Sequence, residues 1–535
     1  MFTFASFFTL GLMVSFVFVI ILLAAYFGGG IDMGMVIGLT VLFNFIMWLV
    51  SPFFMDLMFS WFYKCKKWTI DDLQKKSPRV AGTVNEICAK HKIKVPRLRF
   101  IEDNNPTAFC FGSGAFNARL AFSNGLFEYL EDDEIEAVIA HELGHIVRRD
   151  FIVMTIAQTL VQVLYEMAHM LMRKKGNDKN NLFYIGLMAY LLFWVSSYLL
   201  LYLSRTREYG ADKFAADNIE NPDSLSRALI KIAYGIIAKP ESRESQRLMN
   251  STRALGIYDN QSARNLGAAY ESSKQDWNFI SRVLLFDLVS PWAKIMELSS
   301  THPLTGKRID ALGKLAIEKG KTSSVDMNMV RHESYDKHKL YSGFMAGAFI
   351  HFLPHILLVA VLATGAVTQN LILAGALPIA LGIGYLVKTL YKYPNTQPQA
   401  ATTFELMSDL YASPVRGRMV AIDGQIIGRG QAGSHFAEDV MLQDKTGLLY
   451  LNYESAFGFI GNFIFGIKKV RKLIGSHVKG SGWFFRGISH HLDLHDIHSD
   501  DGKSFKSRPA MWAIIGAVVM IVVGVAVMGN INSWV

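Results

Sequence analysis

The sequence predicts a predominantly α-helical polytopic membrane protein with soluble regions that also contain short strands. The 535-residue chain is 51% hydrophobic and only 19% charged, which is too apolar for an ordinary soluble protein of this length. Its apolar residues gather in long runs that approach or exceed the length of a bilayer span. Between these runs lie short apolar or alternating segments separated by Asn, Pro and Gly, a pattern typical of strands.

Seven apolar runs are predicted to be membrane helices: 4–27, 33–63, 151–172, 182–203, 341–367, 371–387 and 511–528. The first run lacks a basic leading region and a small-residue cleavage pattern, so we expect it to remain as an anchor. The runs divide the chain into a transmembrane hairpin (1–63), a soluble region (64–150), a second hairpin (151–203), a soluble region (204–339), a third hairpin (340–392), a β-rich soluble domain (393–510) and a C-terminal transmembrane helix (511–528).

The distribution of charge predicts the orientation of these segments. The net charge of +9 does not indicate a nucleic-acid-binding protein, because the Lys and Arg residues gather beside the ends of the apolar runs. Positive-inside bias then places the soluble regions on the cytoplasmic side of the inner membrane. The basic loop 173–181 disagrees, because this topology places it outside. Cys65, Cys88 and Cys110 lack paired spacing, which fits a reducing compartment.

The first soluble region is expected to begin with a helix and three short strands. Ser77 and Pro78 have the form of an N-cap and a first helical residue, and the apolar spacing continues the helix to about residue 90. The predicted strands of a small antiparallel sheet are 98–101, 108–111 and 119–122. An edge of this sheet could accept an extended peptide as a further strand, and an ordinary solvent-capped edge is the alternative.

Residues 135–149 are predicted to form one helix that carries His141, Glu142 and His145 in the order His-Glu-x-x-His. Residues four apart share one face of a helix, so both imidazoles can reach one ion while Glu142 lies beside the open coordination position. Zinc peptidases have this arrangement, in which the glutamate removes a proton from the zinc-bound water. The pattern therefore predicts a zinc site.

Two local features of this segment favour a helix. Asp133 is expected to act as its N-cap, in a capping box with Glu136. Gly144 lies inside the motif, where glycine costs a helix about 1 kcal/mol relative to alanine. Its presence suggests that another element packs closely against the backbone there.

A catalytic zinc ion usually has three protein ligands, so a third is needed. Glu208 is the predicted third ligand, because it lies directly after a membrane run. Asp212 comes four residues later, on the same helical face, and can accept the free N–H of a zinc-binding histidine. Loss of such a carboxylate weakens metal binding or activity by about 10- to 100-fold.

Together these motifs resemble the HtpX family of membrane zinc endopeptidases, to which the type-one CAAX prenyl proteases are related. The resemblance rests on HELGH at 141–145, a following pair of membrane runs, SRTREYGAD at 204–212, and Thr-His-Pro at 301–303 before Arg-Ile at 308–309. It covers about residues 1–320 and ends there.

The resemblance implies a zincin-type α+β metallopeptidase domain with one Zn2+ per chain. The implied zinc ligands are His141, His145 and Glu208, with Glu142 as general base. His302 matches a histidine thought to stabilise the oxyanion in such enzymes, and a helix-capping histidine is the alternative. The implied activity is cleavage of membrane or misfolded proteins on the cytoplasmic side.

The resemblance also indicates a substrate-binding strand. The family often has Asn-Ala-Phe at this edge, where this chain has Thr107, Ala108 and Phe109. With Asn105, these residues are the expected substrate contacts.

The part of the chain beyond residue 320 is predicted to add a small, OB-like β-barrel after a linker at 394–400. The predicted strands are 419–422, 425–427, 440–443 and 448–453, with a hairpin turn at 423–424 and another turn at 444–447. Such barrels bind many things, so the fold alone names no ligand.

Two stretches within this domain allow more than one interpretation. Residues 456–467 are apolar and followed by four basic residues, so they could lie in the membrane interface or form a buried loop with a solvated basic face. Residues 490–498 contain four histidines, but their alternation favours a strand with polar side chains over a second metal site.

The sequence as a whole predicts a membrane-embedded zinc endopeptidase of broad quality-control function, with the lipid bilayer and protein substrates as partners and no nucleic acid. A specific processing protease of the CAAX type is an alternative that the sequence leaves open. A non-catalytic scaffold with a structural zinc site is the other, but Glu142 argues against it, because a structural site needs no general base.

Overall fold

The computed structural model describes residues 16, 20, 33–62, 65–173, 179–238, 270, 276–327, 335–369, 373–429, 438–487 and 490–531. The chain forms two compact units, the first from residues 1–267 and 295–327 and the second from 268–294 and 328–535. The predicted membrane helix over 4–27 lies outside the described residues, apart from residues 16 and 20.

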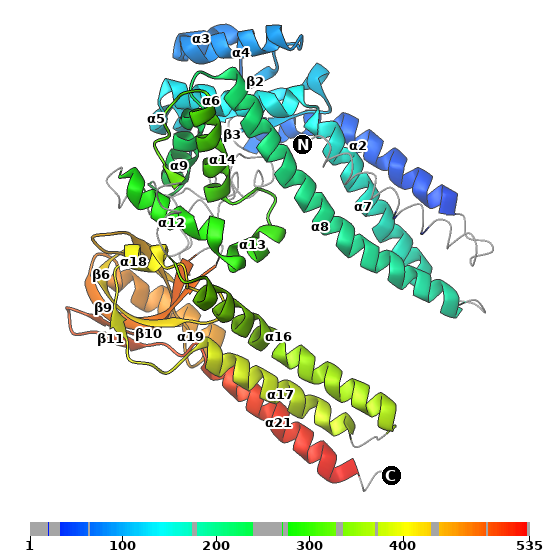
Figure 1. The fold of residues 1–535 in the computed structure, drawn as a ribbon, viewed down its shortest axis with the longest axis vertical. Coiled ribbons are helices and arrows are strands. Elements are labelled where there is room, and N and C mark those ends of the chain that lie inside the picture. The colour runs from blue at the N-terminus through cyan, green and yellow to red at the C-terminus, as the bar shows by residue number, and fades with distance from the viewer. Residues whose placement is uncertain are drawn as a thin grey trace. The chain divides into compact units, whose positions relative to one another are not determined.

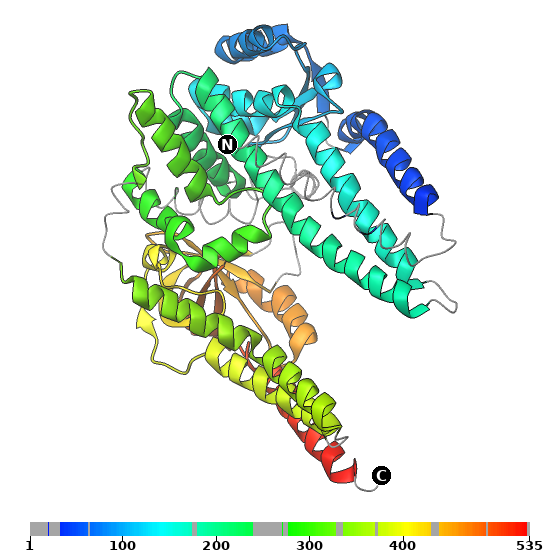
Figure 2. The same ribbon diagram turned by 45° about the vertical axis from the view of Figure 1, so that its right-hand side comes forward.

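Five helices in the described part of the chain are long and apolar enough to cross a membrane. They are α2 (Met33–Phe62), α7 (Asp150–Arg173), α8 (Lys179–Asn218), α16 (Lys337–Thr368) and α21 (Met511–Ile531), and each covers a predicted run. In the first unit, α7 and α8 lie side by side as a hairpin (Figures 1 and 2). In the second, α17 (Leu373–Lys392) covers the predicted run 371–387 and packs against both α16 and α21 (Figure 1).

The helix α8 is continuous over 40 residues, so the predicted membrane run and the segment that carries Glu208 form one helix. Apolar residues occupy its first part, and the polar sequence SRTREYGAD continues it without a break. The side chain of Glu208 is therefore held by the same helix that enters the membrane.

The soluble part of the first unit contains a four-stranded sheet of order β1-β2-β4-β3. Its strands are β1 (Cys65–Trp68), β2 (Arg97–Ile101), β3 (Ala108–Phe111) and β4 (Arg119–Ser123). The prediction of a purely antiparallel sheet is wrong, because β4 inserts between β2 and β3 and runs parallel to β2. The β1 strand was not predicted, since its sequence Cys-Lys-Lys-Trp has no strand-like alternation over a useful length. As predicted, β3 is an edge strand.

Three helices pack on this sheet: α3 (Ile70–Lys76), α5 (Asn124–Tyr129) and α6 (Asp132–Val147). Three more pack on other helices of the unit: α4 (Pro78–Lys90), α9 (Asp223–Ala238) and α14 (Thr305–Glu318). The helix α4 begins as predicted, because the Ser77 hydroxyl accepts a hydrogen bond from the Val80 N–H at 3.4 Å and Pro78 is its first residue. A short 3-10 turn, η1 (Ala115–Asn117), connects β3 to β4.

The helix α6 contains the His-Glu-x-x-His motif, but it begins earlier than predicted. Its N-cap is Glu131, and Glu134 completes the capping box by accepting the Glu131 N–H at 3.0 Å. The prediction of Asp133 and Glu136 as the capping pair is therefore wrong. The physical reason is that both carboxylates bind side chains from other helices, as described below.

The second unit contains a closed β-barrel in which five strands pair in a ring, in the order β6-β7-β8-β10-β9 and back to β6. The strands are β6 (Arg418–Arg429), β7 (Val440–Gln443), β8 (Leu448–Asn452), β9 (His477–Arg486) and β10 (His490–Ser499). The pair β8 and β10 is parallel, and the other four pairs are antiparallel. Apolar side chains such as Val420, Leu449 and Phe484 fill the interior.

Further elements surround the barrel. These are the short strands β5 (Gln399–Ala400) and β11 (Ser504–Lys506), α18 (Thr403–Ser408), the helical segment α19 (Gly458–Phe465), η2 (Gly466–Val470) and α20 (Arg471–Leu473), and α12 (Trp277–Val289), which packs on α18. The helix α13 (Pro291–Leu298) follows α12 in the chain.

The predicted hairpin at 423–424 is wrong, whereas the turn at 444–447 is confirmed. The strand β6 continues straight through Asp423 and Gly424, because both residues pair with β9. A Cβ atom at Gly424 would lie 2.5 Å from the carbonyl oxygen of Gln443, so glycine is required here by close strand packing rather than by a turn. At the true turn, the Asp444 N–H donates to the Gly447 carbonyl at 3.0 Å.

Candidate active site

The helices α6 and α8 approach each other closely at the His-Glu-x-x-His motif. A Cβ atom at Gly144 would lie 3.0 Å from Cδ1 of Phe214 and 3.3 Å from Cα of Ala211, both on α8. A Cβ atom at Gly210 would overlap the guanidinium of Arg148. The expectation that an element packs against Gly144 is confirmed, and this close approach brings α8 side chains to the histidines.

The side chains of His141, His145 and Glu208 converge at the contact between these two helices. Each offers one ligand atom within 4.8 Å of the others, and all three residues are buried. The Nε2 atoms of His141 and His145 each lie 3.6 Å from a different oxygen of Glu208. Among the described residues, this is the group of His, Cys, Asp and Glu side chains with the geometry to hold a metal ion.

The donor set fits a zinc ion. Two imidazole nitrogens and a carboxylate oxygen are a common set of three protein ligands for catalytic zinc, which leaves a position for water or substrate. Nε2 of His141 is buried and has no hydrogen-bond partner within the described part of the chain. A buried polar atom without a partner is costly, and a bound cation at this point would satisfy it.

A carboxylate supports each histidine from behind. Nδ1 of His141 lies 2.9 Å from Oδ1 of Asp212, and Nδ1 of His145 lies 2.7 Å from Oδ2 of Asp150. Each contact fixes a ring so that Nε2 faces Glu208. Asp212 was predicted for this role, whereas Asp150 was missed, because it lies beyond the end of α6, where helix spacing does not apply.

Arg308 holds Asp212 in place. Its Nε and Nη2 donate to the two oxygens of Asp212 at 2.9 and 2.6 Å, and both side chains are buried. Such a two-point contact fixes the carboxylate plane. The Arg-Ile pair at 308–309, noted in the sequence as part of the resemblance, thus acts on the site through Asp212.

The pKa values of His141 and of Glu142, both on α6, are raised for different reasons. Burial lowers the pKa of His141, but the nearby carboxylates of Asp212 and Glu208 outweigh burial and raise the pKa to about 9. Burial raises the pKa of the Glu142 carboxyl, against the lowering effect of the two neighbouring histidines. A buried carboxyl with a raised pKa is a better proton acceptor than one in water.

Glu142 also contacts a residue that the sequence did not single out for this site. The thiol of Cys110, on β3, lies close enough to the Glu142 carboxyl for each group to shift the pKa of the other. Burial raises the pKa of this thiol well above its ordinary value, and the Glu142 charge raises it further. Because β3 is distant in sequence from α6, no local pattern could have indicated this contact.

His302 lies at the site as the resemblance implies. Its Nδ1 is 3.2 Å from Oε2 of Glu208. The alternative, a helix cap, does not apply, because the N-cap of α14 is Leu304, without a side-chain hydrogen bond. Arg205 on α8 positions the loop by donating to the carbonyls of Glu297 and Ser300 at 2.7 and 2.8 Å.

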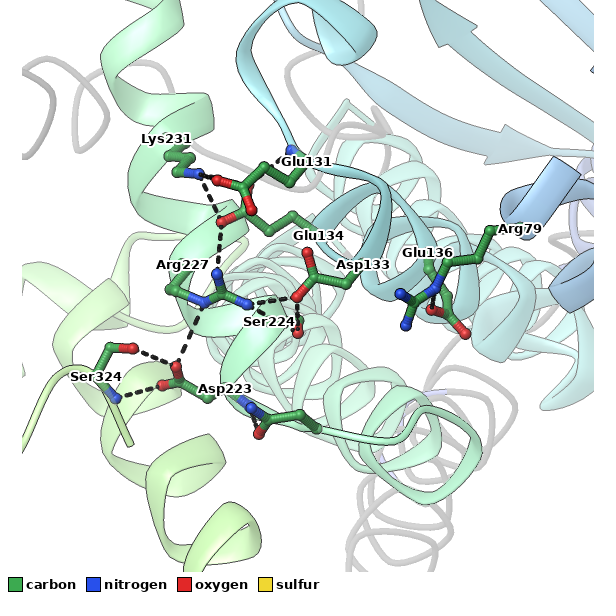
Figure 3. Close-up of polar contacts among 11 residues, drawn as sticks. Arg79, Glu131, Asp133, Glu134, Glu136, Asp223, Ser224, Arg227, Lys231 and Ser324 are labelled. Atoms are coloured by element: carbon green, nitrogen blue, oxygen red, sulfur yellow. Dashed lines mark hydrogen bonds and ion pairs between the residues drawn. The ribbon is translucent and has the colours of Figure 1, made fainter. Parts of the chain in front are cut away.

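The first turn of α6 is tied to the surrounding helices by ion pairs (Figure 3). Arg227 on α9 contacts Asp133 and Glu134, and Lys231 lies 2.8 Å from Glu134. On the other side, Arg79 of α4 lies 2.6 Å from Glu136. These contacts fix the orientation of the metal-site helix at its N-terminus, where acidic side chains also suit the helix dipole.

The expected substrate residues lie on or before the edge strand β3. Asn105 is buried, and its carbonyl accepts a hydrogen bond from the Ser123 hydroxyl at 2.6 Å. Ala108 and Phe109 are fully buried, and the Phe109 ring packs 5.4 Å from that of Phe59. Their side chains therefore belong to the core, and only the outer backbone edge of β3 is left for a peptide strand.

Comparison with known proteins is consistent with this geometry. A sequence profile of peptidase family M48 matches residues 74–316. A protease HtpX homologue from Syntrophobacter fumaroxidans is 32% identical over 206 residues, covering 37% of this chain and 72% of the relative. Another from Pyrococcus abyssi is 29% identical over 320 residues, covering 58% of this chain and 96% of the relative.

One solved structure is also similar. The crystal structure of S. mikatae Ste24p has a TM-score of 0.33 and 15% sequence identity, and the match covers 56% of this chain and 62% of that chain. The sequence matches, the convergent His-His-Glu group and the helices able to span a bilayer together identify the protein. The chain belongs to peptidase family M48, as a multi-pass, HtpX-like membrane metallopeptidase.

Proposed function

We propose that this protein is a zinc-dependent endopeptidase of the inner membrane that hydrolyses peptide bonds of membrane or misfolded proteins on the cytoplasmic side. The observation that carries the proposal is the convergence of His141, His145 and Glu208 within 4.8 Å in the buried contact between α6 and α8. Glu142, next to His141 on α6, supplies a general base, which a structural metal site would not need.

In this proposal the two histidines and Glu208 hold the ion, and Asp212 and Asp150 hold the histidines. A bound zinc ion would lower the pKa of a water molecule and polarise the scissile carbonyl. Glu142 removes the proton from the attacking water and delivers it to the leaving amine. Cys110 and the burial of Glu142 keep this carboxyl oriented and poorly solvated.

His302 is proposed to donate a hydrogen bond to the substrate oxygen on which negative charge develops. The distance of 3.2 Å between Nδ1 of His302 and Oε2 of Glu208 supports this role, because it places the imidazole beside the three proposed zinc ligands. A substrate is proposed to pair along the outer edge of β3, next to the expected contact residues, through backbone hydrogen bonds that depend little on sequence. Such binding suits an enzyme with many substrates.

The proposed peptidase domain consists of residues 64–150 and 204–339, interrupted by the hairpin 151–203. The C-terminal barrel is proposed to be OB-like. Its ring of five strands supports this, with the parallel pair β8 and β10 and a helix between β8 and β9. We assign the barrel no ligand from its fold alone.

The test uses the full-length protein, purified with zinc and reconstituted in lipid nanodiscs with an unfolded membrane protein as substrate. We expect cleavage and about one zinc per chain by elemental analysis. Glu142→Gln should keep the zinc and lower the cleavage rate by about 10²- to 10⁴-fold, as expected for loss of a general base. Glu318→Gln, at the exposed end of α14, is the matched control. Zinc-loaded protein that never cleaves would refute the proposal.

Broad quality control and specific processing predict different substrates. Comparing the membrane proteomes of cells with wild-type and Glu142→Gln protein distinguishes them. We expect many membrane proteins to accumulate in the variant. Accumulation of a single precursor would instead indicate a processing protease.

A further inference from the structure

The helical segment from α19 to α20 has one side that belongs to the barrel core. Phe465, Val470 and Leu473 are buried with the barrel strands, and the Phe465 ring stacks on Tyr453 with centroids 3.6 Å apart. The segment is therefore held firmly in one orientation, and its other side is fixed with it.

That other side is apolar and exposed to a degree that is unusual for a soluble surface. The exposed fractions of Phe457, Phe459 and Ile460 are 80%, 83% and 68%, and Ile464 and Ile467 on the following turns are also exposed. A patch of large exposed apolar side chains usually marks a surface that a membrane or another molecule covers. We refer to these five side chains as the α19 face.

The charged residues within the segment 456–474 have a single sign, whereas the carboxylates of Glu438 and Glu454 lie beside the buried Asn462 of α19. Residues 456–474 contain no Asp or Glu. Lys468, Lys469, Arg471 and Lys472 follow the apolar turns, and all four are exposed. None forms an ion pair with an acidic side chain in the described part of the chain. The covering surface should therefore combine an apolar interior with a negatively charged boundary.

The position of the α19 face identifies that surface. At the start of α19, a Cβ atom on Gly458 would lie 3.5 Å from the Trp512 indole nitrogen, in the first turn of the membrane helix α21. Just before each helix, the Arg508 N–H donates to the Glu454 carbonyl at 2.7 Å. The α19 face is thus fixed beside the point where α21 starts to cross the bilayer.

We propose that α19 lies in the plane of the membrane interface, with the α19 face among the lipid acyl chains and the four cations against anionic phospholipid headgroups. Interfacial helices combine an apolar face with flanking Lys and Arg, and Trp at the end of a span lies at the same depth. A protein partner would explain the apolar side chains, but not their fixed position beside a membrane span. The inference does not depend on the peptidase chemistry.

The test measures the depth of single side chains in purified, reconstituted full-length protein. The background variant is Cys65→Ser, because Cys65 is half-buried whereas Cys88 and Cys110 are buried and poorly reactive. In this background Phe459→Cys is labelled with an environment-sensitive fluorophore. The control is Lys479→Cys on β9, because the Lys479 side chain is 69% exposed. Lys479 lies four residues before Trp483, and the Trp483 indole donates a hydrogen bond to the Pro394 carbonyl just after α17.

In vesicles of equal parts phosphatidylcholine and phosphatidylglycerol, the probe at 459 should emit at shorter wavelength than the probe at 479. A spin label on the upper acyl chain should quench the probe at 459, and aqueous iodide should not. The reverse pattern is expected at 479. Quenching of 459 by iodide alone would overturn the proposal, because the face would then lie in water.

The charges are tested separately by Lys468→Glu combined with Lys469→Glu. This variant should become more accessible to iodide at 459 in the anionic vesicles, with a smaller change in pure phosphatidylcholine. A probe that is exposed in vesicles but protected in native membranes would overturn the proposal in favour of a protein partner. Protection that disappears on dilution of the protein in lipid would do so in favour of a second copy of the chain.

Discussion

Two regions of this protein are rich in histidine, and their geometries differ in an instructive way. On α6, His141 and His145 lie four residues apart with ring centroids 4.9 Å from each other, and a third group arrives from α8. On β10, four histidines lie within nine residues, yet they do not converge. Density of histidines in a sequence is therefore less informative than the periodicity of the element that carries them.

Two of the β10 histidines have close local partners of their own. His490 is buried, and its Nε2 lies 3.2 Å from the Leu448 carbonyl oxygen. His495 is exposed, and its Nδ1 lies 2.8 Å from Oδ2 of Asp496. Successive residues of a strand face opposite sides, so neighbouring imidazoles cannot share one ion. The prediction of a strand with polar side chains is confirmed.

The largest effect should come from removing a ligand. Glu208→Ala leaves two nitrogen ligands, and we expect loss of stoichiometric zinc and of cleavage activity. His495→Ala in the barrel should change neither, as measured by elemental analysis and peptide cleavage. Unchanged zinc content in Glu208→Ala would disprove the third-ligand assignment.

A smaller effect is expected from the carboxylates that orient the histidines. Asp150→Asn should keep the fold and weaken zinc binding by about 10- to 100-fold, measured by competition with a chelator. Asp496→Asn is the matched change beside a barrel histidine and should leave zinc affinity unaltered. If both variants bind zinc as the wild type does, the contact between Asp150 and His145 is only structural.

The ion pairs at the start of α6 should contribute to stability more than an exposed pair does. Arg227→Met removes the cation that Asp133 and Glu134 share, and within the described residues only Glu134 keeps another cation, Lys231. We expect a loss of about 2 kcal/mol in the free energy of unfolding in detergent. Lys213→Met removes an exposed pair with Asp217 and should cost about 0.3 kcal/mol. Equal losses would mean that the network in Figure 3 is no more than a surface feature.

The smallest effect concerns pH and the barrel. Burial lowers the pKa of His490 to about 4, so the unfolded chain takes up a proton at higher pH than the folded barrel does. Stability should therefore be nearly constant above about pH 7 and fall as the pH drops towards 4, with about 1.4 kcal/mol lost by pH 5.5. The measurement compares the denaturant midpoints of the wild type and of His490→Phe across this pH range. His498→Gln, at an exposed position, should keep the wild-type dependence.

Much of the site could be predicted from sequence because its parts have local signatures. The order His-Glu-x-x-His fixes a helical face, and Glu208 with Asp212 repeats the same spacing on a second helix. Neither Asp150 nor Cys110 has such a signature, because each reaches the site through the tertiary packing of α6. The wrong capping pair has the same origin, since Arg227 of α9 binds the carboxylate of Asp133 and Arg79 of α4 binds that of Glu136.

The fold was predictable to a similar extent. Five of the predicted apolar runs correspond to helices in the described residues that are long and apolar enough to cross a membrane, a property that depends on local length and composition. The parallel pairing of β2 with β4 and the passage of β6 through Asp423 and Gly424 were not predictable, since both depend on neighbouring strands. The preference of Asp-Gly for a turn is overridden here, because β6 is paired with a strand on each side.

The unbroken helix α8 sets how far a substrate must travel. The apolar run ends at Leu203 and Glu208 follows five residues later, a rise of about 7.5 Å along a helix. An extended chain covers that length with two or three residues, at about 3.3 Å each. Under the proposed function, a membrane-protein substrate would need to release only a short stretch next to its own span to reach the site, whereas a soluble substrate would first have to come to the bilayer surface.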